Sequence, residues 1–433
     1  MSKKPEDIFN FTATSDDCIK CGKCIPVCTI HQVHPDETTS PRGFIELLGA
    51  YQQGHLELDK NAKDIFESCF LCTNCVDVCP NSLATDMVIE EVRADIADKF
   101  GIAWFKKGFF FLLRNRKIMD FVMKFGYMFK TCALANDPQD RGLKARFSLP
   151  MIKKGRLLPS MVKTSFLNSY PEEILAKNQE AKPQRIALFI GCLANYNYTG
   201  IGDSLVEVLA KLNIDVFIPK KQLCCSAPAY FTGDMSSVEY MTKKNIAYFE
   251  SFMDDCDAML IPEATCSAMM THDWAVFFKN HDMADWEARA KKVSQKMHMA
   301  TAWLDDNTPL QAMLKEKGKR FDTAVTYHDP CHAKKVQGIY KQPRNLLSAN
   351  YPMVEMSDSD RCCGFGGVTM QTEKFHFAQL AGMPKATMIE ETKATYVSAE
   401  CSACRMQLSE ALNHAEVETI FKNPIELIAE GLK

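Results

Sequence analysis

The sequence Cys18-Ile-Lys-Cys21-Gly-Lys-Cys24-Ile-Pro-Val-Cys28 decides how the first hundred residues fold. A second run, Cys69-Phe-Leu-Cys72-Thr-Asn-Cys75-Val-Asp-Val-Cys79, repeats its C-x2-C-x2-C-x3-C spacing. This spacing is typical of cubane [4Fe–4S] binding, because three thiolates on one tight loop can reach three irons of a single cube. The fourth thiolate lies about one helical turn further on and, where two such runs occur, binds the other cluster.

The interleaved spacing assigns four cysteines to each of two clusters. The predicted ligands of cluster I are Cys18, Cys21, Cys24 and Cys79, and those of cluster II are Cys69, Cys72, Cys75 and Cys28. Structural zinc is the alternative, since C-x2-C pairs also hold zinc. Zinc sites use looser spacing and do not need two complete four-cysteine runs, so the pattern favours iron and sulfide.

Composition restricts the class of protein. A length of 433 residues suggests about two to four domains. A formal net charge of −3 argues against a partner made of nucleic acid. The segment Met1–Asp7 contains no secretion signal, and no apolar stretch approaches the ~18 residues that a bilayer span needs. In such a chain, 19 cysteines indicate metal rather than disulfides. We expect a cytoplasmic location, with or without peripheral attachment to the inner face of the membrane.

Residues 1–100 are expected to form an α-helical ferredoxin-like module, with helical apolar patterns at Phe44–Leu48 and Met87–Arg93. Residues 101–184 are expected to form a basic amphipathic helix and a linker. The apolar positions at helical spacing are Phe111, Ile118, Val122, Phe125 and Phe129, and basic residues fall largely elsewhere. Such a helix has three alternative roles: it lies on an anionic membrane surface, docks a protein partner, or covers the next domain with a solvated basic face.

The rest of the chain carries an internal repeat, over residues 185–320 and 321–433. The order strand, cysteine, helix, strand, vicinal cysteines, helix, strand, cysteine occurs in both halves. The expected strands are 186–190, 216–218 and 258–261 in the first repeat and 324–327, 353–355 and 396–397 in the second. Strands that alternate with helices predict a small parallel α/β layer in each repeat. The fold class is therefore α+β and multidomain: a helical ferredoxin-like module followed by two duplicated α/β cysteine-rich units.

The second repeat contains a five-cysteine array of the form C…C-C-G…C-x2-C. Its members are Cys331, Cys362, Cys363, Cys401 and Cys404. Adjacent cysteines rarely aim both sulfurs at corners of one cube, so the array suits a site in which sulfurs bind several irons asymmetrically. Buried free thiols are the alternative. His328 and His332 flank Cys331, either as ligands that tune the site or as structural hydrogen-bonding residues.

The first repeat departs from this pattern. It keeps four thiols, which are Cys192, Cys224, Cys225 and Cys266. Met269 stands where the second repeat has Cys404, and Ser226 replaces the glycine after the vicinal pair. Because a thioether is a weak ligand for such a cluster, the first repeat is either a further cluster site or an emptied structural copy. Cys132 and Cys256 fit no array and are expected to be buried thiols.

The five-cysteine array resembles the CCG domain of heterodisulfide reductases, which implies a noncubane [4Fe–4S] cluster held by those five residues. From residue 15 to 415, the order of two cubane runs, linker and two CCG units resembles the iron–sulfur subunit of membrane-associated flavin dehydrogenases. That family includes the iron–sulfur subunit of anaerobic glycerol-3-phosphate dehydrogenase, that of glycolate oxidase, and the lactate-utilisation proteins. Gly191–Asn197 and Tyr327–His332 look similar to the first branch, Ser40–Gly43 to the second and Cys362–Gly367 to the third.

The sequence contains no glycine-rich G-x-G-x-x-G fingerprint for a flavin or a nicotinamide. We therefore expect no catalytic residue in this chain and a flavoprotein partner that oxidises the substrate. The chain is then an electron-transfer subunit that passes electrons singly from the flavin towards a quinone or a membrane-anchor partner. The alternatives are a disulfide or quinone reductase acting at the C-terminal array, and a scaffold whose metal is only structural.

Overall fold

The computed structural model describes residues 11–139, 141–148, 152, 154–178 and 183–433. Met1–Asp7, on which the expectation about a secretion signal rests, lies outside the described residues. Internal contacts divide the chain into two compact units, here called the N-terminal and C-terminal units. The N-terminal unit comprises Met1–Phe111, Ser226–Glu239 and Cys362–Pro384, and the C-terminal unit comprises Leu112–Cys225, Tyr240–Arg361 and Lys385–Lys433. The domain boundaries expected at residues 100, 184 and 320 stay predictions.

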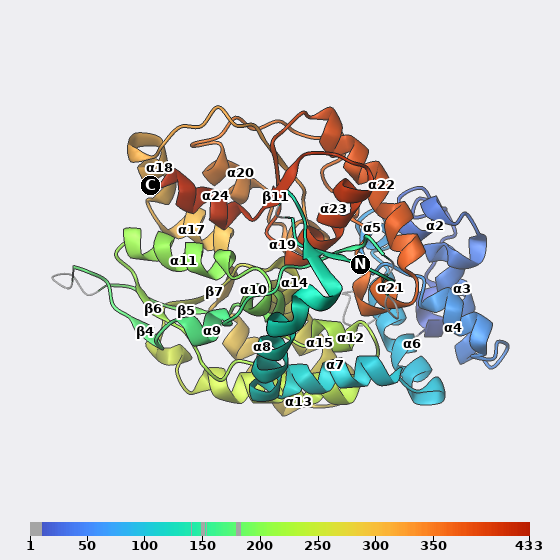
Figure 1. The fold of residues 1–433 in the computed structure, drawn as a ribbon. Helices are drawn as coiled ribbons and strands as arrows, with labels where there is room; N and C mark the ends of the chain where they lie inside the picture. The colour runs from blue at the N-terminus through green and yellow to red at the C-terminus, as the bar shows by residue number, and fades with distance from the viewer. Residues whose placement is uncertain (1–10, 140, 149–151, 153, 179–182) are drawn as a thin grey trace. The chain divides into compact units, whose positions relative to one another are not determined.

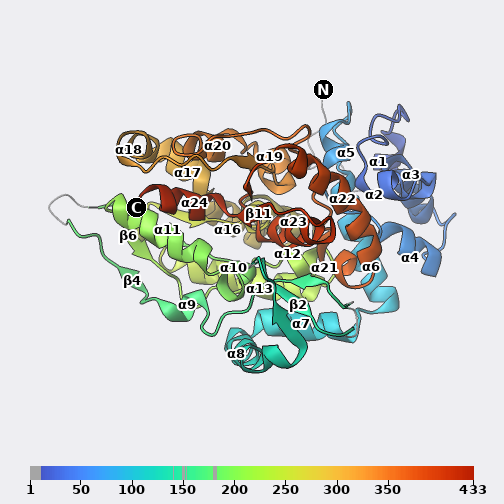
Figure 2. The same ribbon diagram turned by 45° about the horizontal axis from the view of Figure 1, so that its top comes forward.

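The N-terminal unit contains only helices among its described residues. They are α1 (Phe11–Asp16), α2 (Thr29–Val33), η2 (Glu37–Thr39), α3 (Pro41–Gln52), α4 (Lys60–Phe66), α5 (Asn74–Asp77), α6 (Thr85–Phe100), most of α7 (Trp104–Arg114), α12 (Ala227–Tyr230) and α21 (Gly367–Thr372). Ser40 caps α3 by accepting a hydrogen bond from the Gly43 backbone N–H at 2.9 Å. The predicted helical patterns lie in α3 and α6, and α1 lies beside α3 (Figure 2).

Two segments from distant parts of the sequence complete this unit. Ser226–Glu239 directly follows the vicinal cysteine pair of the first repeat, and Cys362–Pro384 begins with that of the second. Arg93 of α6 donates a hydrogen bond to the carbonyl oxygen of Phe231 at 2.8 Å. Lys106 of α7 donates one to Thr369 Oγ1 at 2.9 Å and forms an ion pair with Glu373. Since Arg93 and Lys106 are both buried, these polar contacts satisfy charges that would otherwise be costly.

The C-terminal unit contains the sheets of both α/β repeats (Figure 1). The first has a five-stranded sheet in the order β4 (Glu173–Ile174), β6 (Asp215–Phe217), β5 (Arg185–Leu188), β7 (Ala258–Ile261) and β8 (Met297–Met299). The second has a three-stranded sheet in the order β11 (Ile420–Lys422), β10 (Tyr396–Ser398) and β9 (Val325–Tyr327). All of these pairings are parallel except that of β4 with β6. The prediction of parallel α/β layers is confirmed. The strand expected at 353–355 is instead a single bridge between Val325 and Met353.

Helices surround both sheets, and one apolar core joins them. The helices are α9 (Phe166–Ser169), α10 (Cys192–Tyr196), α11 (Gly200–Lys211), α13 (Met235–Glu250), α14 (Ala264–Ala268), α15 (Trp274–Asn280), α16 (Ala284–Ser294), α17 (Ala300–Asn307), α18 (Leu310–Lys317), α19 (Cys331–Gln337), α20 (Lys341–Leu347), α22 (Phe375–Glu391), α23 (Ser402–His414) and α24 (Pro424–Gly431). Ile186 of the first sheet and Val325 of the second belong to the same buried cluster. Helix α11 of the first repeat lies beside α24 of the second, and α17 beside α20 (Figures 1 and 2).

The predicted amphipathic segment is not one continuous helix. It divides at Asn115 into α7 and α8 (Arg116–Ala133), because Asn115 leaves the helical conformation. Helix α8 buries Met119 and exposes a stripe of apolar side chains, among them Phe121 at 71% and Phe125 at 56%. The linker after α8 forms a small antiparallel sheet of β1 (Leu134–Asn136), β2 (Leu143–Ala145) and β3 (Leu157–Leu158), which the sequence did not predict. Within the described part of the chain, no helix has both the length and the apolar character required to cross a bilayer.

Candidate metal centres

The four cysteines predicted for cluster I line one cavity in the N-terminal unit. These are Cys18, Cys21, Cys24 and Cys79. The first three lie on the loop between α1 and α2, and Cys79 follows α5, about sixty residues after Cys18 in sequence. Lys20 at φ 55° and Gly22 at φ 76° take left-handed backbone conformations. These conformations allow the loop to fold tightly enough for its sulfurs to face a common space.

The four cysteines predicted for cluster II line a second cavity in the same unit. These are Cys28, Cys69, Cys72 and Cys75. Leu71 and Thr73 again have positive φ angles, of 50° and 58°. The cavity wall also includes Phe44 and Phe70, so this site is more apolar than an exposed loop. The structure thus brings together the two sets that interleaved spacing predicts, and their role as ligands stays a prediction.

The chemistry of these thiols fits iron. Burial raises the pKa of Cys69 to about 12 and also raises the pKa of Cys24 and Cys75. The thiols of Cys24, Cys69 and Cys75 therefore favour their protonated form when no metal is present, and a positively charged metal replaces the protons when it binds. Each cavity offers four soft sulfur donors, which is the donor set that iron–sulfur clusters require.

Cys362, the first of the vicinal cysteines in the second repeat, also lies in the N-terminal unit. A hydrogen bond between its thiol and that of Cys72 is the largest of the effects that raise the pKa of Cys72. The Gly364 N–H donates to Cys362 Sγ at 3.4 Å. Gly364 has φ 87°, and a Cβ atom there would lie 2.9 Å from Cβ of Ala381. The glycine of the C-C-G motif is therefore required by both backbone conformation and space.

The other three cysteines of the five-cysteine array lie in the C-terminal unit. Cys331 begins α19, and its Sγ lies 3.6 Å from His332 Nδ1. Cys401 caps α23 by accepting a hydrogen bond from the Cys404 backbone N–H at 3.4 Å. The side-chain hydrogen bond from Cys404 lowers the pKa of Cys401, so a thiolate is favoured at this helix N-terminus. The array is thus divided between the units, and its action as one ligand set stays a prediction.

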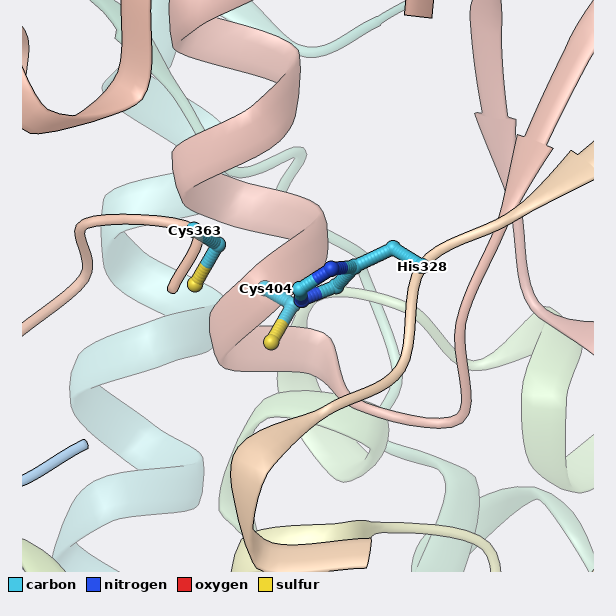
Figure 3. Close-up of side chains that lie close together, drawn as sticks. All are labelled: His328, Cys363 and Cys404. Carbon is cyan, nitrogen blue, oxygen red and sulfur yellow. The ribbon is translucent and has the colours of Figure 1, made fainter. Parts of the chain in front are cut away.

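His328 lies beside Cys404. It follows β9, whereas Cys404 is in the first turn of α23 (Figure 3). An imidazole nitrogen of His328 and Cys404 Sγ are within 4.8 Å of each other. Burial lowers the pKa of His328, so the ring is neutral.

The four thiols of the first repeat also converge. Cys192 forms a side-chain hydrogen bond with Cys224, and Cys225 forms one with Cys266. A Cβ atom on Gly191 would lie 3.0 Å from Cys266 Sγ, so the backbone passes close to this thiol. Whether the four hold a metal stays a prediction.

Of the two residues that depart from the array in the first repeat, Met269 is accommodated in the core, whereas Ser226 keeps the left-handed backbone conformation of the glycine that it replaces, which costs strain. Ser226 takes φ 79°, close to the φ 87° of Gly364 at the equivalent place. Met269, which replaces the last cysteine, is fully buried. Of the two cysteines outside the arrays, Cys256 is buried as expected. The expectation for Cys132 is wrong, because it is exposed on α8.

The sequence analysis missed two buried glutamates next to the cysteines. The Glu263 carboxylate accepts hydrogen bonds from the backbone N–H of Ser402, at 2.7 Å, and from its hydroxyl. Burial raises the pKa of Glu263 to about 7 and that of Glu400 to about 8. Each glutamate follows the end of a strand and precedes a cysteine, at Glu263-x-x-Cys266 and Glu400-Cys401. That recurrence in both repeats is the signal that could have identified them.

Comparison with known proteins agrees with this arrangement. The family model described as "4Fe-4S dicluster domain" matches residues 14–83, and that described as "Cysteine-rich domain", CCG, matches residues 186–271 and 325–409. Lactate utilization protein A of Geobacillus kaustophilus is 30% identical over 220 residues, 50% of this chain and 87% of that protein.

Two longer matches cover most of this chain. The probable glycolate oxidase iron-sulfur subunit of Bacillus subtilis is 25% identical over 400 residues, 90% of this chain and 88% of that protein. One subunit of the fumarate reductase (CoM/CoB) of Methanothermobacter marburgensis is 25% identical over 417 residues, 94% of this chain and 70% of that protein. With its dicluster domain, its two cysteine-rich domains and these relatives, the chain belongs to the CCG-domain family of iron–sulfur electron-transfer proteins.

Proposed function

We propose that this chain is the iron–sulfur electron-transfer subunit of a membrane-associated flavin-dependent dehydrogenase. The partner flavoprotein oxidises glycerol 3-phosphate or a 2-hydroxy acid such as glycolate or lactate, and electrons leave this chain towards a quinone. The names of two relatives, a glycolate oxidase iron-sulfur subunit and a lactate utilization protein, support the class of substrate. A bound iron–sulfur cluster supplies transfer of one electron at a time, which suits a flavin that releases two electrons separately.

The observation that carries this proposal is the contact between the thiols of Cys72 and Cys362. Cys72 is a predicted ligand of cluster II, and Cys362 is a predicted ligand of the noncubane cluster of the second repeat. Their contact brings one sulfur of each predicted ligand set close to the other, and this proximity supports a short path for an electron between two redox sites that lie about three hundred residues apart in sequence. A protein whose metal is only structural has no need of such a contact.

Three sets of cysteines hold the proposed clusters, and a fourth set forms a candidate further site. Two cubane clusters use the two sets that line the cavities of the N-terminal unit, and the noncubane cluster uses the five-cysteine array. Cys192, Cys224, Cys225 and Cys266 form the candidate further site. The Cys401 thiol at the N-terminus of α23 favours negative charge and supports this role of the second repeat.

The exposed face of α8 supports attachment to the inner face of the cytoplasmic membrane. Phe121 stacks on Phe125, and Phe125 packs against Phe129 with ring centroids 4.6 Å apart. Lys117 and Lys124 on the same helix are exposed. An exposed aromatic stripe accompanied by lysines is the pattern of a helix that lies in the surface of an anionic bilayer.

An anaerobic reduction assay tests the function. The chain, reconstituted with iron and sulfide, is mixed with candidate flavoprotein dehydrogenases and their substrates, and its visible absorption is followed. We expect one pair to bleach the chain and a soluble quinone to restore its colour. The Cys132→Ser variant should behave as the wild type, because Cys132 belongs to no array. Failure of every flavin-containing partner to reduce a fully loaded chain would overturn the proposal.

A second candidate function is a disulfide or quinone reductase that acts at the second repeat. It is favoured by the similarity to a fumarate reductase named for CoM and CoB. It is also favoured by the resemblance of the five-cysteine array to the CCG domain of heterodisulfide reductases. Turnover of a disulfide by the isolated chain with a chemical reductant would support it. Absence of turnover by a chain that still accepts electrons from a flavoprotein would remove it.

A further inference from the structure

A hydrogen bond to the backbone determines which ring nitrogen of His328 carries the proton. Its Nδ1 lies 3.1 Å from the carbonyl oxygen of Ser359. A carbonyl oxygen can only accept a hydrogen bond, so Nδ1 carries the proton. In a neutral imidazole the lone pair is then on Nε2.

That lone pair lies in the interior without a partner among the described residues. His328 is 1% exposed, and its Nε2 is buried and makes no hydrogen bond there. Leaving a buried acceptor unsatisfied costs about 1–3 kcal/mol, so such a group usually has a function. The Cys404 thiol, a member of the predicted site, lies close by, with its Sγ within 4.8 Å of an imidazole nitrogen of His328 (Figure 3).

The surroundings of His328 hold it in this orientation. Lys385, fully buried in α22, donates to the same Ser359 carbonyl at 3.1 Å and to the Asp358 carbonyl. Asp329, the next residue, forms an ion pair with Arg344 and accepts a hydrogen bond from the Ser359 hydroxyl at 2.9 Å. The Ser359 carbonyl, which determines the tautomer of His328, is therefore held in place by Lys385 and by the hydrogen bond from the Ser359 hydroxyl to Asp329. Histidines that bind metals usually have this arrangement, with the second ring nitrogen bonded to a carbonyl or a carboxylate.

We propose that Nε2 of His328 binds an iron of the noncubane cluster, next to Cys404, as a nitrogen ligand in a site otherwise made of sulfur. The inference rests on the proposed function, since it requires a cluster at the second repeat. Because the imidazole is neutral, it adds a ligand without the negative charge that a further thiolate would bring, and less negative charge raises the potential of an iron–sulfur centre, as it does where two histidines bind one iron of a [2Fe–2S] pair. His328 would thus make this site a better acceptor of electrons than an all-cysteine site.

The test uses the full chain, purified without oxygen, and pulsed electron paramagnetic resonance of the signal that Cys404→Ser abolishes. We expect a strong nitrogen hyperfine coupling that changes when histidine is labelled with ¹⁵N and is lost in His328→Gln. The matched control is His332→Gln, which alters the other histidine near Cys331 and should leave the coupling unchanged. Circular dichroism checks that both variants fold.

The outcomes separate this inference from the function. A chain that contains iron and sulfide at the second repeat but shows no strong histidine coupling overturns the ligand role of His328 and leaves the electron-transfer function standing. A coupling lost in His332→Gln instead of His328→Gln also overturns it. Absence of any signal that depends on Cys404, in a chain with full iron and sulfide, overturns both the inference and the cluster at the second repeat.

Discussion

At the scale of single residues, burial and neighbouring thiols control the chemistry of the cysteines. Burial favours the protonated thiols of Cys24, Cys69 and Cys75 in the metal-free chain, because a buried thiolate is poorly solvated. Cys401 in the second repeat differs from them, since the hydrogen bond from Cys404 and the helix N-terminus lower its pKa. Spacing in the sequence could predict which cysteines come together, but it could not predict this difference, which depends on burial and on contacts such as that between Cys72 and Cys362.

The interleaved assignment of ligands makes a prediction about pairs of substitutions. Cys18→Ser and Cys79→Ser should each remove the same cluster, so the double variant loses about four irons per chain, as each single variant does. Combining Cys79→Ser with Cys69→Ser should remove both cubanes, about eight irons. Iron and acid-labile sulfide analysis measures the loss, and Cys132→Ser is the control with unchanged iron. Additive loss in the first double variant would contradict the assignment.

The raised pKa of Cys69 predicts how the metal-free chain responds to pH. The folded pKa is about 12, above the ordinary value of 9.0, so folding favours the protonated thiol. Its contribution to stability is complete below about pH 9 and is lost as the pH rises towards about 12. We expect the Tm of the metal-free chain to fall between about pH 9 and about pH 12, and to fall less in Cys69→Ser. An identical pH dependence in wild type and variant would contradict the effect of burial on this thiol.

At the scale of elements, very short strands and helices position the cysteines. Cys192, Cys331, Cys266 and Cys404 lie at or in the first turns of α10, α19, α14 and α23. Strands of three residues bury too few side chains to produce a clear pattern, which is why β8 and β11 could not be predicted. The break at Asn115 was missed for a related reason: apolar residues keep their helical spacing across it, and the cause is backbone conformation.

Helix α8 should bind anionic vesicles through its aromatic stripe. Replacing Phe121 and Phe125 by serine removes apolar area from this face, and we expect binding to vesicles that contain anionic lipid to fall about tenfold or more. Sedimentation with vesicles measures the bound fraction. The matched control is Leu175→Ser, since Leu175 is 68% exposed outside α8. Equal binding by both variants would contradict the role of α8, as would binding that does not weaken when neutral lipid replaces anionic lipid.

The hydrogen bonds between Glu263 and Ser402 should stabilise the C-terminal unit by linking the loop before α14 to the start of α23. Ser402→Ala removes the hydroxyl donor from a buried carboxylate, and we expect the free energy of unfolding to fall by about 1–3 kcal/mol. Urea denaturation of the metal-free chain measures it. Ser348→Ala is the control, because Ser348 is exposed and its loss should cost less than about 0.5 kcal/mol. Equal stability of the two variants would show that the Glu263 contact contributes little.

At the scale of the whole molecule, the sequence predicts the order of parts better than their assembly into units. The two cysteine runs and the duplicated strand–cysteine pattern predicted the dicluster domain and the two cysteine-rich repeats, which the family matches confirm. The sequence could not predict that Ser226–Glu239 and Cys362–Pro384 belong to the N-terminal unit. Their attachment depends on buried contacts, such as that of Arg93 with Phe231, between residues far apart along the chain.

The central claim is that sulfur-bound iron in this chain carries electrons singly, and a redox titration of the anaerobically purified chain tests it most directly. Iron, acid-labile sulfide and electrons taken up per chain are measured on the same sample. We predict a brown protein with about twelve irons, or about sixteen if the first repeat is also loaded, that accepts electrons in separate one-electron steps. A colourless protein without sulfide, or one whose metal accepts no electrons, would contradict the account.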